Sequence, residues 1–143
     1  MSQYILGILL ILAMAIDIKT KRIPNSFLIV LYLLGAGIEY YKHGAEVVVV
    51  CAMAVLLIII LFPTYMIGAF GAGDIKLFGA MSLFIGFIPT LTCFYYSLLI
   101  CGSVSIFILC FERIRKSGRK RKHYVSYTIF IFLGYVFTLW NKR

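Results

Sequence analysis

Long apolar stretches separated by short polar pieces dominate this 143-residue chain. Six such segments can be read, at about 3–18, 26–41, 46–67, 75–88, 90–111 and 124–140. A helix that crosses a bilayer uses about 20 mainly apolar residues. Since 63% of the residues are hydrophobic and 13% are charged, little polar surface remains to cover a water-soluble globule. We therefore predict an all-α, polytopic membrane protein, a bundle of about six transmembrane helices forming one domain over residues 1–143.

The first segment could be a signal peptide or a retained helix. No basic residue precedes it and the charges follow it, which favours a retained helix. The fourth segment is the weakest, because it is short, begins beside Asp74 and Lys76, and is separated from the fifth by little more than Pro89.

The basic residues predict the orientation in the membrane, because Lys and Arg concentrate in cytoplasmic loops. Eleven of the fourteen flank the first, third and fifth loops: Lys19, Lys21, Arg22, Lys76, Arg113, Arg115, Lys116, Arg119, Lys120, Arg121 and Lys122. The other side keeps Lys42, Lys142 and Arg143. This asymmetry predicts a multi-pass protein of the inner (plasma) membrane, with both termini outside and the 112–123 loop in the cytoplasm. Topology, rather than nucleic-acid binding, then explains the net charge of +9.

Metal and redox chemistry find little support in the sequence. The four cysteines lie inside apolar stretches and form no CxxC pair, so we expect them to be packing residues: Cys51, Cys93, Cys101 and Cys110. His43 and His123 fall on opposite sides, and no HExxH or GxSxG motif is present. We expect neither a metal nor a cofactor.

The five acidic residues divide into two groups. Glu39, Glu46 and Glu112 lie in or beside loops and look like ordinary interfacial charges. Asp17 and Asp74 instead sit at the edges of apolar segments, where an ionisable group is a functional candidate by default. Both are predicted to lie at the cytoplasmic face.

Each aspartate adjoins a turn. After Asp17, Pro24 cannot continue a helix and favours an extended Ile23, so the chain turns back, and Asn25 and Ser26 could cap the returning helix. Asp74 follows the glycine-dense stretch 68–73, which permits close backbone approach and positive φ. A simple helix cap is an alternative explanation of Asp74.

Two neighbouring carboxyls cannot both ionise easily, so such a pair shares one proton. The ionised member can activate a water while the protonated member donates to the developing oxyanion, which is the chemistry of peptide hydrolysis by aspartyl proteases.

The segments around the two aspartates resemble motifs of a known protein family. Asp17 followed six residues later by Ile23-Pro24-Asn25, together with Gly71-Ala72-Gly73-Asp74, resembles the two signatures of type IV prepilin peptidases, which are GxGD intramembrane aspartyl proteases. The resemblance covers nearly the whole chain. It implies removal of the leader peptide of prepilin-like substrates at the cytoplasmic membrane face, by Asp17 and Asp74. It also implies that Gly71 and Gly73 shape the loop, while Lys76 either stabilises negative charge or snorkels to the interface.

The chain lacks the cytoplasmic segment with paired CxxC motifs that larger, bifunctional members carry, and it is similar to the compact members of tight-adherence pilus systems. N-methyltransferase activity stays open, as do the substrate and the oligomeric state. A non-enzymatic small transporter or membrane assembly scaffold, using both aspartates as an ion or proton site, is the alternative. A regulatory or inactive paralogue is a third hypothesis. If the chain is a peptidase, opening between the fourth and fifth helices would be one route by which a substrate helix enters.

Overall fold

A computed structural model describes residues 2–21, 23–68, 70–114 and 127–141. Within these ranges every element is a helix: α1 (Ser2–Thr20), α2 (Asn25–His43), the one-turn 3-10 helix η1 (Gly44–Glu46), α3 (Val47–Met66), α4 (Ala72–Ile85), α5 (Phe87–Ile114) and α6 (Tyr127–Asn141). The predicted all-α class is confirmed, and each of the six apolar segments corresponds to one α-helix.

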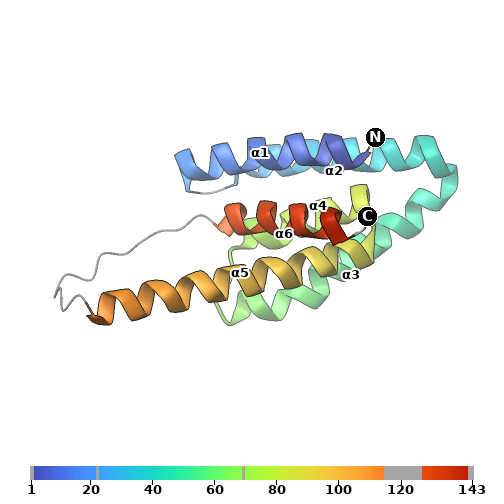
Figure 1. The fold of residues 1–143 in the computed structure, drawn as a ribbon. Helices are drawn as coiled ribbons and strands as arrows, with labels where there is room; N and C mark the ends of the chain where they lie inside the picture. The colour runs from blue at the N-terminus through green and yellow to red at the C-terminus, as the bar shows by residue number, and fades with distance from the viewer. Residues whose placement is uncertain (1, 22, 69, 115–126, 142–143) are drawn as a thin grey trace.

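The helices run back and forth between two ends of a bundle (Figure 1). One end, on the left of the view, holds the α1–α2 turn, the end of α5 and the start of α6, and the α3–α4 connection faces the same way. The other end holds η1, the α4–α5 junction and both chain termini. The first and third connections therefore lie toward one end, as the alternation of six segments predicts.

Three described stretches are long and apolar enough to cross a membrane: Gln3–Thr20, Asn25–Met66, which joins α2 to α3, and Phe87–Ile108. The helices α4 and α6 are shorter, with 14 and 15 residues. At 1.5 Å per residue they extend only about 21 and 22 Å, against a hydrocarbon core of about 30 Å.

The short helix α4 is the centre of the bundle. It packs against α1, α2, α3 and α5, and from Leu77 to Phe84 its side chains are buried on all sides. Its buried residues are Ile75, Leu77, Phe78, Gly79, Ala80, Met81, Ser82, Leu83 and Phe84. A helix that is apolar all round is stable only when other elements surround it. This position places the residues at the start of α4 against the neighbouring helices.

The end of α4 corrects one predicted boundary. We expected the fourth segment to cover 75–88, but the helix ends at Ile85, because Gly86 takes a φ of 90° that continues no right-handed helix. The following helix begins at Phe87.

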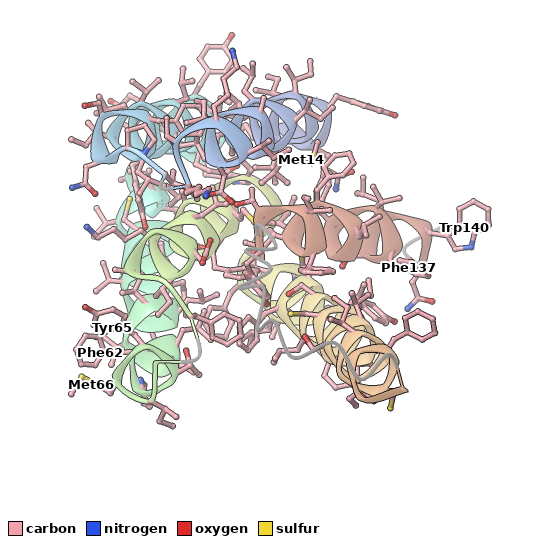
Figure 2. The ribbon with its side chains drawn as sticks, turned by 90° about the vertical axis from the view of Figure 1, so that its left-hand side faces the viewer. Met14, Phe62, Tyr65, Met66, Phe137 and Trp140 are labelled. Atoms are coloured by element: carbon pink, nitrogen blue, oxygen red, sulfur yellow. The ribbon has the colours of Figure 1, made fainter. Side chains whose placement is uncertain are left out.

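The outer surface of the bundle is apolar. Phe62, Tyr65 and Met66 lie on one flank and Phe137 and Trp140 on another, away from the helix interfaces (Figure 2). Such a surface is unfavourable in water and suits a lipid environment. The fold is that of a helical membrane protein.

Candidate active site

Asp17 lies on the buried face of α1. The buried residues of this helix are Leu6, Leu10, Ala13 and Asp17, a spacing of four, three and four that keeps them on one face. Asp17 is 9% exposed, whereas Ile18 beside it points outward. The register of α1 therefore directs the carboxyl into the bundle.

The last helix supplies a partner for this carboxyl. Thr128 of α6, which is fully buried, donates a hydrogen bond of 2.7 Å from its hydroxyl to Asp17 Oδ2. Thr128 is not among the site residues predicted from the sequence. A single threonine in an apolar segment carries no signal, and its partner lies 111 positions away along the chain.

The chain turns sharply after Asp17. The Lys21 amide donates to the Asp17 carbonyl oxygen at 2.8 Å, and Lys21 takes a φ of 54°, the one positive value among the described non-glycine residues. Pro24 is extended, with φ −67° and ψ 138°, and α2 begins at Asn25. The predicted turn is present.

The predicted cap of α2 is wrong. Pro24 occupies the cap position, and neither Asn25 nor Ser26 makes a side-chain cap hydrogen bond, because the helix already begins at Asn25. The Asn25 side chain has another partner: its Oδ1 accepts a hydrogen bond of 3.3 Å from Lys76 Nζ.

Asp74 lies in the first turn of α4, and Gly71, not Asp74, occupies the cap position. Asp74 nevertheless serves the start of the helix, because its carboxyl accepts a hydrogen bond from the Gly71 backbone and so satisfies one of the free amides there. A Cβ atom at Gly71 would lie 3.1 Å from Asp74 Oδ2, so the missing side chain leaves room for the carboxyl. The positive φ expected in this stretch occurs at Gly68, at 76°, and not at Gly71 or Gly73.

The two signature segments contact each other directly. A Cβ atom built on Gly73 would lie 3.5 Å from Ile23 Cβ, so the glycine loop packs against the first turn. The hydrogen bond from Lys76 to Asn25 adds a polar contact, and Tyr32 of α2 donates to the Lys76 carbonyl oxygen at 2.9 Å. The structure thus brings together the predicted site residues Ile23, Asn25, Gly73 and Lys76. The Lys76 side chain is exposed and is held by Asn25.

The carboxyl of Asp74 is half-buried and lies outside the three long apolar stretches. Burial, followed by the charge of Asp17, raises the pKa of Asp74 from its ordinary value of 3.8 to about 6, and a hydrogen bond with the Gly71 backbone opposes this shift. The two acids are therefore close enough to interact electrostatically. A pair of this kind can hold one proton between two carboxyls and so offers an acid and a base together.

Aromatic rings connect the Asp74 loop to the last two helices. The Phe70 ring lies 4.7 Å from that of Tyr127 and 5.5 Å from that of Phe94, centroid to centroid. The Tyr127 hydroxyl lies 2.9 Å from Ser97 Oγ. These contacts hold the loop against α5 and α6.

Within the described ranges no group of three or more His, Cys, Asp or Glu side chains could hold a metal ion. The four cysteines are free thiols, and that of Cys93 is buried with its Sγ 3.6 Å from the Ile131 carbonyl oxygen. His43 lies 3.8 Å from Glu39 at the end of the bundle away from the two aspartates, whereas His123 lies outside the described residues.

The fold and site define a helical membrane protein with two interacting acids at one end of its bundle. The model of the type IV leader peptidase family matches residues 4–108, which include Asp17 and Asp74. The chain belongs to the type IV leader peptidase family. Searches of curated proteins and of solved structures gave no match.

Proposed function

We propose that this chain is an intramembrane aspartyl endopeptidase that removes the leader peptide of prepilin-like proteins at the cytoplasmic membrane face. The observation that carries the proposal is the interaction of Asp17 with Asp74, two acids that come from separate signatures and separate helices. Membership of the leader peptidase family supports the same class of activity.

The proposed reaction uses both carboxyls. The ionised one takes a proton from a water whose oxygen attacks the scissile carbonyl carbon, and the protonated one donates to the carbonyl oxygen. When the tetrahedral intermediate collapses, the C–N bond breaks and the leaving amine takes up a proton. Burial and the neighbouring acid raise the pKa of Asp74 to about 6, so Asp74 keeps a proton more readily than a free aspartate and suits the role of the acid.

The position in the bundle supports a site at the membrane surface. Asp17 lies in the last turns of α1 and Asp74 in the first turn of α4, next to the connections at one end of the bundle. Hydrolysis requires water, which the lipid interior does not supply. The basic residues Lys19, Lys21 and Lys76 lie near the same end, which favours the cytoplasmic side.

The alternative of a transporter or scaffold would also use two membrane-embedded acids. It gives no role to the packing of the Ile23 turn against Gly73, and it has no support from the family. We therefore favour the peptidase.

Co-expression tests the proposal. The chain would be produced with small proteins of its own genome that have a short basic leader before a hydrophobic helix, and product masses would be measured. We expect a mass loss equal to the leader only when the chain is present, and an extra methyl mass would reveal methylation. If the chain inserts into the membrane and no such protein is shortened, the proposal fails.

A further inference from the structure

The family match ends at residue 108, yet α6 contributes a residue to the site. Thr128 is fully buried, and its hydroxyl is 2.7 Å from Asp17 Oδ2. Hydroxyls of other buried threonines in the bundle are used differently. Thr138 of the same helix donates to the Gly134 carbonyl, and Thr90 of α5 donates to the Gly86 carbonyl. Thr128 therefore differs in directing its hydroxyl to a carboxyl on another helix.

We propose that Thr128 is a positioning residue of the peptidase, which holds Asp17 by its Oδ2 atom and leaves Oδ1 to accept the proton of the attacking water. This inference rests on the proposed function. A hydroxyl that donates to Oδ2 requires that oxygen to be an acceptor. Within the described part of the chain, Oδ1 accepts no hydrogen bond of its own.

Close packing of α6 against its neighbours holds Thr128 in place beside Asp17. Gly134, one and a half turns further along, packs directly on the backbone of α5, where an added Cβ would lie 2.7 Å from the Cys93 carbonyl oxygen. The residue next to Thr128, Tyr127, packs on Phe70 of the Asp74 loop. The start of α6 is therefore held by the Asp74 loop as well as by α5.

The chemistry explains why a hydrogen bond to one oxygen matters. A general base acts only when its lone pair points at the water, and a catalytic group moved by about 1 Å can lower the rate about 100-fold. The carboxyl of Asp17 can rotate about its Cβ–Cγ bond unless a partner holds it. Thr128 is the described side chain that donates to it.

Cleavage kinetics of the purified protein in detergent, with a substrate identified by co-expression, test the inference. Thr128→Val keeps the shape and removes the hydroxyl, Thr128→Ser restores it, and Thr138→Val is the matched control in the same helix. We expect Thr128→Val to lower kcat at least about tenfold with little change in KM and in thermal midpoint. We expect Thr128→Ser and Thr138→Val to stay within about threefold of wild type.

A Thr128→Val protein that cleaves at the wild-type rate would overturn the inference and leave the peptidase intact. If Thr128→Val fails to fold, Thr128→Ala replaces it, since alanine also lacks the hydroxyl and adds no bulk. A folded Thr128→Ala protein with wild-type kcat overturns the inference equally, and a reduced kcat rescued in Thr128→Ser supports it. Normal cleavage by Asp17→Asn would instead overturn the proposed function, and the role of Thr128 with it.

Discussion

Asp17 occupies a position on α1 where the preceding turns place Ala13, Leu10 and Leu6. A carboxyl on such a buried face destabilises a fold unless hydrogen bonds support it. Thr128 is the described side chain that donates a hydrogen bond to this carboxyl. Asp74 is in a similar situation, because burial and the neighbouring acid both oppose its ionisation. We interpret both acids as serving the proposed chemistry, and Asp74 also accepts a hydrogen bond from the Gly71 backbone.

The raised pKa of Asp74 predicts how stability depends on pH. The pKa is about 6 in the folded protein against an ordinary value of 3.8, so ionised Asp74 destabilises the fold. This effect is complete above pH 6 and disappears as the pH falls toward 3.8. We therefore expect Asp74→Asn to raise the thermal midpoint in detergent at pH 7.5, and to raise it less at pH 4.5.

The control for this measurement is Glu46→Gln, which changes an exposed acid at the opposite end of the bundle and should leave the midpoint unchanged at both pH values. An Asp74→Asn protein that is less stable than wild type at pH 7.5 would show that the ionised carboxyl stabilises the fold, against this account.

At the scale of the elements, the short helices α4 and α6 contribute Asp74 and Thr128 to the site and are held by longer neighbours. The helix α4 is held by α2 through Tyr32 and Asn25, and α6 is held by α5 through Gly134. A Cβ at Gly134 would lie 2.7 Å from the Cys93 carbonyl oxygen and 2.9 Å from the Ser97 amide nitrogen. Backbone atoms of a helix cannot move aside easily, so only glycine fits there.

Gly134→Ala should therefore push α6 away from α5. We expect a loss of about 1–3 kcal/mol in the free energy of unfolding, as for other overpacked interfaces, measured by denaturant titration in micelles. Gly102→Ala is the matched control on α5, since an added Cβ there meets no heavy atom within 4 Å. Equal stability of the two variants would mean that α5 and α6 are packed less closely than the structure has them.

The sequence was sufficient to predict the helices and to single out the two acids. It was not sufficient to predict which side chains contact each other across the bundle. Apolar periodicity and the two signatures locate Asp17, Asp74 and the turn at Pro24 without knowledge of the packing. The predicted cap of α2 was mistaken, because an Asn near a helix start has other possible partners. Asn25 bonds to Lys76 and Asp74 interacts electrostatically with Asp17, and such long-range pairings depend on packing that no local pattern encodes.

At the scale of the whole molecule, both termini lie at the end of the bundle opposite the connections that adjoin the two aspartates (Figure 1). The excess of Lys and Arg at the aspartate end predicts that this end faces the cytoplasm. Both termini would then face outside.

Fusions after Arg143 test this orientation in cells. We expect a C-terminal alkaline phosphatase fusion to be active, because this enzyme folds only outside the cytoplasm, and a C-terminal green fluorescent protein fusion exported by the same route to be dark. Bright fluorescence with inactive phosphatase would place the termini in the cytoplasm and the aspartates on the wrong side for a cytoplasmic leader.

The most direct test of the central claim is leader removal by Asp17→Asn and Asp74→Asn, compared with wild type by mass spectrometry of a co-expressed prepilin-like substrate. Asparagine keeps the size of each side chain and removes its acid–base function, and loss of a general acid or base lowers rates about 100- to 10,000-fold. We predict that both variants insert into the membrane at wild-type levels and leave the leader attached. Normal cleavage by either variant would contradict the assignment of Asp17 and Asp74 as the catalytic pair.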